Sequence, residues 1–218
     1  MSTGEQQAAQ TGLTVTGVRR VHSRAVLTLS NGETRTMPRA LLRERPYRVG
    51  VPFDEGAFDA LLRERAYPFA LERAVSLLAV RARTECELRD ALRQCAYSEA
   101  TIERVIARMD EAGYIDDADF AGQWAASRTG KGLGARRIAM ELRRKGVDAE
   151  IIEQAIGQID EEERADSVLR AAQKAARGKD LASPADRQKV FAALMRRGYG
   201  AADARQAISS LLSEQNDE

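Results

Sequence analysis

The sequence is poor in the side chains on which most enzyme chemistry depends. Its 218 residues include one histidine, two cysteines and one tryptophan, and aromatic residues make up 5% of the chain. A single histidine, His22, excludes most histidine-based catalysis and most zinc sites, because these need several nitrogen or sulfur ligands close together. No set of nucleophile, base and oxyanion donors can be assembled. We therefore expect no catalytic residue, no metal and no cofactor.

Two further absences concern the compartment in which the protein works. No apolar run approaches the roughly 18 residues that suggest a membrane-spanning helix. Met1–Gly12 lacks the basic and then apolar pattern of a signal peptide. Cys86 and Cys95 are nine residues apart on one expected helix, which is too far for a disulfide. These features predict a folded monomer of the cytoplasm with no membrane partner.

The net charge is close to zero, but the charges are segregated along the chain. There are 34 basic and 33 acidic residues. Val18–Arg48 has a balance of +6, Ala118–Val147 one of +5, and Asp148–Arg164 one of −6. This pattern predicts distinct basic and acidic faces that suit a polyanion or a charged partner. A salt-bridged helical surface would give the same pattern, so both interpretations stay open at this point.

The first fifty residues differ from the rest. Three runs are rich in β-branched side chains: residues 13–21, 24–29 and 33–37. Asn31-Gly32 separates the last two runs and is typical of a type I′ hairpin turn, in which both central residues have positive φ. We interpret residues 13–50 as a small three-stranded antiparallel unit with a short helix near residues 39–45. Residues 1–12 are expected to be a disordered tail, and residues 51–68 a connecting helix or linker.

From about Asp54 onward the pattern is helical and repeats. Three copies of one motif begin 50 and then 52 residues apart, at Leu92, Leu142 and Leu194. Each leucine has an apolar residue four positions before it and an isoleucine fourteen positions after it. Four positions after each leucine comes a small residue that can end a helix, namely Ala96, Gly146 or Gly198. A larger apolar residue follows each of them.

Each copy therefore predicts a unit of three helices. The expected helices are 69–80, 85–95, 99–112, then 119–128, 135–145, 149–159, then 163–177, 184–197 and 201–213. The five prolines are expected at boundaries between elements, Pro68 among them. Repeat 1 would span residues 69–116, repeat 2 residues 117–160 and repeat 3 residues 161–218. One such unit buries little core, so neighbours must stack. The predicted fold is mainly α, with three tandem three-helix repeats in an elongated array after the small β-rich unit.

The middle repeat has a specific pattern over thirty-five residues. It reads Gly113-Tyr-Ile-Asp-Asp117, Phe120-Ala121, Arg128, Gly132-Leu-Gly-Ala-Arg-Arg-Ile138 and Glu141-Leu-Arg-Arg-Lys-Gly-Val147. This pattern resembles the RecX family of bacterial regulators of the RecA recombinase, and the resemblance extends over about Pro68 to Leu212. Two positions depart from it: Ala135 replaces a common proline and Ala96 a usual glycine.

The resemblance implies a protein that binds the RecA nucleoprotein filament along its groove. Members dampen filament growth, ATP hydrolysis, strand exchange and co-protease activity, and so limit recombination and the SOS response. They have no catalytic site of their own.

The residues themselves suggest where a partner would bind. On helix 135–145, Ala135, Ile138, Ala139 and Leu142 form an apolar stripe, and the arginines lie opposite. Glu141 can pair with Arg137 and Lys145 at four-residue spacing, which leaves Arg136, Arg143 and Arg144 without a local partner. The repeat alignment places Lys189 and Arg196 at the positions of Arg137 and Arg144, whereas repeat 1 has Glu87 and Gln94 there. The candidate partner-binding residues are Arg128, Lys131, Arg136, Arg137, Arg143, Arg144, Lys145, Lys189, Arg196 and Arg197.

A second class of function shares part of the pattern. Three-helix units with a basic helix also resemble helix-turn-helix regulators of transcription, but the third helices here are acidic or neutral, with Glu150 and Glu153 in repeat 2. Phosphate contacts to single- or double-stranded DNA remain open beside the RecA filament as partner.

Some notable residues have structural rather than functional explanations. We expect Tyr114, Phe120 and Trp124 to belong to the core of the middle repeat. Asp116-Asp117 is expected to cap a helix N-terminus, and His22 to face solvent. Gly132-Leu-Gly134 is too short for a nucleotide loop.

Overall fold

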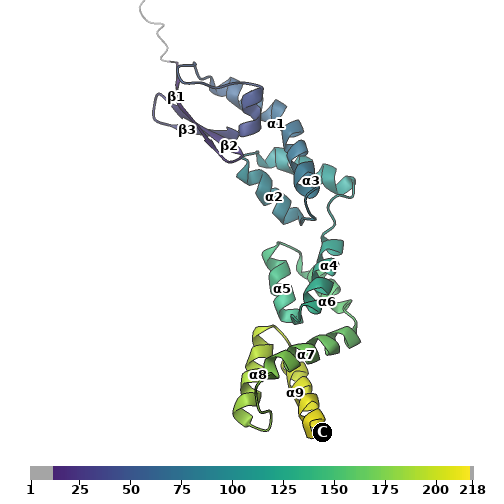
Figure 1. Cartoon of the computed structure of the whole chain (residues 1–218). Helices are drawn as coiled ribbons and strands as arrows, with labels where there is room; N and C mark the ends of the chain where they lie inside the picture. The colour runs from purple at the N-terminus through teal and green to yellow at the C-terminus, as the bar shows by residue number, and fades with distance from the viewer. Residues whose placement is uncertain (1–11, 217–218) are drawn as a thin grey trace, which may run out of the picture. The chain divides into compact units, whose positions relative to one another are not determined.

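The computed structural model describes residues 12–216, and the side chains among them up to Ser213. The described residues form three strands, one short 3-10 helix and nine α-helices (Figure 1). Contacts divide the chain into two compact units, one formed by residues up to 82 with 87–115, the other by residues 83–86 with those from 116 onward. The predicted class, mainly α after a small β-rich unit, is confirmed. The predicted tail at residues 1–12 falls almost entirely outside the described residues.

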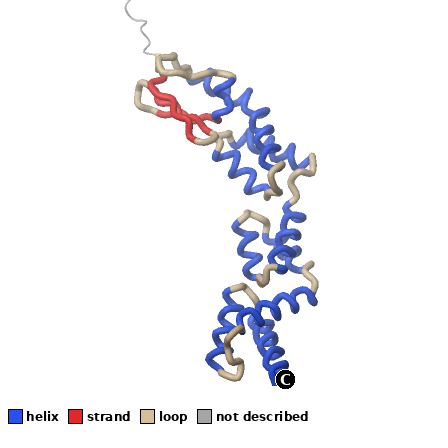
Figure 2. The backbone as a smooth tube through the Cα atoms, in the orientation of Figure 1, coloured by secondary structure: helices blue, strands red, loops and turns tan. Residues whose placement is uncertain are grey.

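The first unit begins with an antiparallel sheet in the order β1 (Val15–Val21), β2 (Arg24–Leu29) and β3 (Thr34–Pro38), drawn red in Figure 2. The central strand alternates between buried and partly exposed side chains, because successive residues point to opposite faces. Ala25 and Leu27 are fully buried on the face that joins the core.

The β2–β3 turn differs from the predicted type I′ turn. Only Gly32 has a positive φ there, at +83°. The Leu29 carbonyl accepts a hydrogen bond from Gly32 N (2.9 Å), and Leu29 N donates to the Glu33 carbonyl (2.9 Å). This is a three-residue loop that ends in a left-handed glycine. Asn31 Oδ1 accepts from Glu33 N (3.0 Å), a local bond that stabilises this alternative.

Three helices complete the first unit after a short 3-10 helix. The 3-10 helix is η1 (Arg39–Arg43), and the three α-helices are α1 (Glu55–Leu78), α2 (Glu85–Gln94) and α3 (Glu99–Glu111). A single hydrophobic cluster joins the inner face of the sheet to these helices. The small sheet, which would be marginal alone, is stabilised by this shared core.

Pro68 lies inside α1, so the prediction that it marks a boundary is wrong. The helix runs from Glu55 through Pro68 to Leu78 and merges the expected connection with the expected first helix of repeat 1. An internal proline costs about 3 kcal/mol. Ala66, Ala70 and Ala74 are buried on both sides of it, so one continuous face packs against the core. This burial explains why the helix continues.

The second unit contains six helices in two sets of three. The first set is α4 (Asp117–Gly130), α5 (Ala135–Arg144) and α6 (Ala149–Gly157); the second is α7 (Glu161–Ala176), α8 (Pro184–Arg196) and α9 (Ala201–Asn216). Each set has its own hydrophobic cluster. The helix bounds lie within a few residues of the predicted ones.

The repeated motif has the same structure in all three copies. The three leucines are fully buried, and the small residues after them all have positive φ: Ala96 (+66°), Gly146 (+77°) and Gly198 (+89°). The next residue donates its N–H back to the leucine carbonyl at 3.2–3.4 Å: Tyr97 to Leu92, Val147 to Leu142 and Tyr199 to Leu194. This is the bond of a Schellman cap. The internal repeat read from the sequence is therefore a repeated helix ending.

Repeats 2 and 3 are joined backbone to backbone. Gly134 N donates to the Arg197 carbonyl (2.9 Å), and Arg136 N donates to the Gly198 carbonyl (3.1 Å). A Cβ on Gly134 would overlap the Gly198 carbonyl, and one on Gly198 would overlap Arg137 N. Because the first N–H groups of a helix have no partner within it, the end of α8 satisfies the start of α5.

Candidate partner-binding surface

Helix α5 separates a buried side from a basic side. Ile138, Ala139 and Leu142 are buried, whereas Arg136, Arg143 and Arg144 are exposed. Ala135 was predicted in the apolar stripe but is exposed, because it is the first residue of the helix. Within residues 12–213, the three exposed arginines have no ion pair or side-chain hydrogen bond. The sequence-based expectation for these three side chains therefore agrees with the structure.

Arg143 and Arg144 occupy the last turn of α5. The carbonyl ends of a helix have a partial negative charge, which favours cations there. The helix thus holds both guanidinium groups at its end while leaving them open to solvent. Arginine in this state can bind carboxylates or phosphates through two parallel hydrogen bonds.

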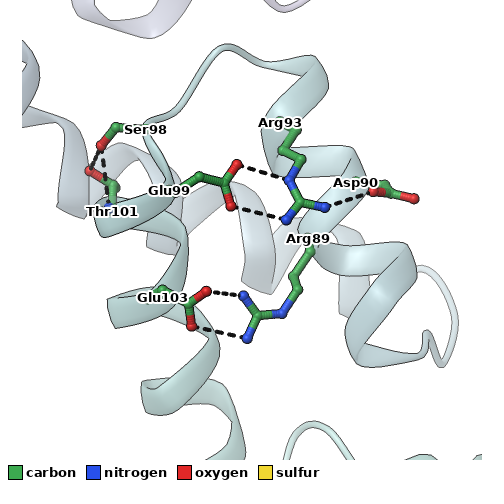
Figure 3. A network of polar contacts seen from close by, with 7 residues as sticks. All are labelled: Arg89, Asp90, Arg93, Ser98, Glu99, Thr101 and Glu103. Carbon is green, nitrogen blue, oxygen red and sulfur yellow. Dashed lines mark hydrogen bonds and ion pairs between the residues drawn. The ribbon is translucent and has the colours of Figure 1, made fainter. Parts of the chain in front are cut away.

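Repeat 1 shows how the same position looks when it is neutralised. The repeat alignment pairs Arg93 with Arg143. Figure 3 shows Arg93 donating to both oxygens of Glu99, at 2.8 and 2.9 Å, and to Asp90 at 3.1 Å. Repeat 2 has Ala149 and Met140 at the positions of these two carboxylates. Arg143 therefore lacks the counter-charges that its counterpart has.

A second pair completes the neutral surface of repeat 1. Arg89 on α2 binds both oxygens of Glu103 on α3 (Figure 3). The hydrogen bond from Arg93 lowers the pKa of Glu99, and that from Arg89 lowers the pKa of Glu103. Both carboxylates are thus held ionised beside their arginines. At the one position where both repeats have an arginine on this helix end, Arg93 of repeat 1 is paired and Arg143 of repeat 2 is open.

Four of the predicted residues contact groups of the protein itself. Arg128 Nε donates to Glu141 (2.9 Å), and its guanidinium lies 4.0 Å from the centre of the Trp124 ring. Arg137 pairs with Glu141 at 3.4 Å, as predicted. Lys145 Nζ lies 4.3 Å from the Trp124 ring centre. Arg197 donates to the Gly132 carbonyl (3.2 Å), so it helps to join repeats 2 and 3.

The remaining three predicted residues are exposed. Lys189 pairs with Asp186 at 2.7 Å. Lys131 and Arg196 have no ion pair or side-chain hydrogen bond within the described side chains. The open cations among the ten predicted residues are therefore Lys131, Arg136, Arg143, Arg144 and Arg196, and we call this set the open basic residues.

Glu141 organises a cluster that the sequence predicted only in part. Besides the two arginines, Trp124 Nε1 donates to it (3.2 Å). Partial burial raises the pKa of Glu141, but Arg128 and the hydrogen bonds from Arg137, Arg128 and Trp124 outweigh burial, so the net shift is downward. Arg128 is thirteen residues from Glu141, and no helical spacing rule would have paired them.

The aromatic predictions hold for two of three side chains. Phe120 is buried and stacks on the half-buried Trp124 with ring centres 5.7 Å apart. Tyr114 was expected in the core, but it is 64% exposed because it lies in the loop before α4. Asp116 caps α4 by accepting from Asp119 N (2.8 Å), as predicted.

Metal sites and membrane spans were not expected from the sequence. Among the described residues, no cluster of three or more histidine, cysteine or carboxylate side chains could hold a metal ion. No described helix is long and apolar enough to cross a membrane.

Family models match all three repeats. Those described as the first, second and third three-helix domains of RecX match residues 70–109, 116–156 and 161–208. A regulatory protein RecX from Mycolicibacterium smegmatis is 38% identical over 175 residues, which cover 77% of this chain and 90% of the relative. The chain belongs to the RecX family. Another RecX, from Amycolatopsis mediterranei, is 48% identical over 100 residues, and this match spans only 57% of its length.

Two solved structures show the same fold. A crystal structure of a regulatory protein RecX has a TM-score of 0.62 at 20% identity and covers 89% of this chain and 98% of its own. RecX from Lactobacillus salivarius has a TM-score of 0.63 at 22% identity and covers 66% of this chain and 96% of its own. At these identities the likeness concerns the fold alone.

Proposed function

We propose that this RecX-family protein binds the RecA nucleoprotein filament through the open basic residues and inhibits its ATP hydrolysis, strand exchange and co-protease activity. It would thereby limit recombination and the SOS response in the cytoplasm, as a monomer without catalysis of its own. Family membership supports the choice of RecA as partner. The contrast between the open Arg143 and the neutralised Arg93 supports the choice of surface.

The physical basis is the cost of desolvation. An exposed arginine that has no internal partner can exchange water for a carboxylate or phosphate of another molecule without breaking an ion pair first. A filament presents such groups at regular intervals, since duplex DNA alone has one charge about every 1.7 Å. Several open cations on repeats 2 and 3 would therefore contact the filament at the same time.

The first test is RecA-driven ATP hydrolysis on single-stranded DNA, titrated with the purified protein. We expect inhibition at or below equimolar amounts. Arg143→Glu with Arg144→Glu should raise the concentration for half-inhibition by about tenfold, which corresponds to about 1.4 kcal/mol. Unchanged ATP hydrolysis and strand exchange across the titration would refute the function.

A matched control separates the surface from general charge effects. Lys174 and Arg177 are also exposed, lie at the end of a helix (α7) in the same unit, and have no ion pair among the described side chains. Lys174→Glu with Arg177→Glu changes net charge and helix-end electrostatics equally. This variant should inhibit like the unmodified protein. If both variants lose the same activity, the contact lies elsewhere.

The transcription-factor alternative makes a different prediction. A helix-turn-helix regulator would protect a defined duplex sequence, whereas the proposed protein should bind DNA weakly, with a steep salt dependence and little sequence preference. A footprint on one duplex sequence would favour the alternative.

A further inference from the structure

The first unit contains a groove that the proposed RecA-binding surface does not include. It has a volume of about 560 Å³ and is lined by residues from β1, the β1–β2 turn, η1, α1 and the loop after α2. This volume falls in the range of about 300–1,000 Å³ that is usual for ligand-binding clefts. The lining residues come from five segments, so the groove depends on the tertiary fold of the unit.

The groove is strongly basic. Arg20, Arg39, Arg43 and Arg73 line it, and all four are exposed. Among its lining residues in the described chain, Glu72 is the one carboxylate. The four arginines therefore outnumber the carboxylates that line the groove.

Three of these arginines are open. Within the described side chains, Arg20, Arg43 and Arg73 have no ion pair or side-chain hydrogen bond, whereas Arg39 donates to the His22 carbonyl (3.3 Å). Other arginines of the same unit are neutralised: Arg35 pairs with Glu55 at 2.7 Å and Arg65 with Glu44 at 2.7 Å. The unit thus contains two kinds of arginine. Some have carboxylate partners within the protein, whereas Arg20, Arg43 and Arg73 line one groove and have no such partner among the described side chains.

Some of the side chains that line the groove are uncharged and apolar or aromatic. Phe69 and Leu42 are half-buried, and Cys95 and Tyr97 are buried. Burial raises the pKa of Tyr97 to about 12, so its phenol is neutral at physiological pH. Cations beside a partly accessible aromatic side chain, which here is Phe69, are the combination that single-stranded nucleic acids meet in their binding grooves, where phosphates contact the cations and bases stack on aromatic rings.

We propose that this groove binds a short segment of single-stranded nucleic acid, with Arg20, Arg43 and Arg73 on its phosphates. The inference goes beyond the proposed function, because it assigns a separate ligand to the sheet-containing unit and requires no RecA. An acidic protein segment would match the arginines, but it would leave the half-buried ring of Phe69 unused.

The test uses the full-length protein and a fluorescein-labelled oligothymidylate, with binding followed by fluorescence anisotropy at several salt concentrations. Changing Arg20, Arg43 and Arg73 together to alanine should weaken binding at least tenfold. Because each phosphate contact on a single strand contributes about 0.7 to the slope of log affinity against log salt, the slope should fall by about 2.

A matched control is available in the same unit. Arg19, Arg48 and Arg63 are exposed, have no ion pair among the described side chains and lie outside the groove. The triple alanine variant at these positions removes the same charge and should bind within about twofold of the unmodified protein. Circular dichroism should show unchanged helical content in both variants, since all six side chains are exposed. Equal losses in the two variants would overturn the proposal, because they would reflect net charge alone.

Two further outcomes decide the nature of the ligand. Duplex DNA of the same length should bind more weakly than the single strand, and polyglutamate should compete poorly. Tighter binding of the duplex or of polyglutamate, lost in the groove variant, would overturn the assignment to single strands. Because these measurements contain no RecA, their failure leaves the ATP hydrolysis test of the proposed function unaffected.

Discussion

At the scale of single residues, Glu141 governs the electrostatics of α5. It accepts hydrogen bonds from Arg128, Arg137 and Trp124 and so neutralises two arginines of repeat 2. Arg143 and Arg144 at the helix end have no such partner among the described side chains. One carboxylate therefore divides the arginines of the repeat into those that stabilise the fold and those available to another molecule.

This arrangement predicts a defined pH dependence. The pKa of Glu141 is lowered in the folded protein, so its contribution to stability is present above its unfolded pKa of about 4.3 and disappears as pH falls through the folded value. Glu141→Gln should reduce the free energy of unfolding by about 1 kcal/mol at pH 7 and by nearly nothing near pH 3. Urea unfolding, followed by the fluorescence of Trp124, measures both values. Glu153→Gln, at an exposed carboxylate of α6, should have little effect at either pH; a pH-independent loss in Glu141→Gln would contradict the explanation.

At the scale of elements, the end of α8 and the start of α5 form the joint between repeats 2 and 3. Gly198 combines a left-handed φ with a close approach to Arg137, whereas Gly134 has an ordinary φ of −82° and only the close approach. Gly178 is the converse, with a φ of +71° and no neighbouring atom within 4 Å of the place that a Cβ would take. These three glycines separate backbone strain from steric overlap.

The expected stabilities follow this division. Gly178→Ala should cost about 1 kcal/mol, the penalty of a left-handed non-glycine residue. Gly134→Ala and Gly198→Ala should each cost more than about 2 kcal/mol, because a methyl group there must displace backbone. Thermal unfolding of the three variants tests the order. Similar losses of stability in all three variants would mean that the repeats can move apart at the joint to make room for a methyl group.

A second prediction at this scale exchanges a charge between repeats. Glu99 is the first residue of α3, and Ala149 is the first residue of α6. Ala149→Glu should therefore give Arg143 the partner that Arg93 has, and it should weaken inhibition of RecA severalfold with no arginine changed. The uncharged Ala149→Gln controls for size. The result to measure is the concentration for half-inhibition of ATP hydrolysis, and equal values for the two variants would contradict the role of an open Arg143.

At the scale of the whole molecule, local rules predicted much of the fold. The repeated leucine and small-residue pattern determines helix ends through bonds that span five residues, so the sequence alone located them. The open state of Arg143 was also predictable, since its helical neighbours at three and four positions offer no carboxylate. Family resemblance at the middle repeat gave the same architecture.

Features that depend on tertiary packing could not be predicted in this way. Pro68 continues a helix because of the core beneath α1, and Arg128 meets Glu141 from another helix. The groove of the first unit gathers arginines from positions 20 to 73 of the chain. No spacing rule brings such residues together, and only the high basic charge of residues 18–48 hinted at them.

The joint between repeats 2 and 3 also limits how the chain can be shortened. The carbonyls of Arg197 and Gly198 accept hydrogen bonds from the first amides of α5. A protein that stopped after Ile159 would leave the Gly134 and Arg136 amides without these acceptors and would expose the apolar side of their surroundings to water. Nonsense mutations between codons 160 and 197 should therefore damage the middle repeat as well as the one they delete.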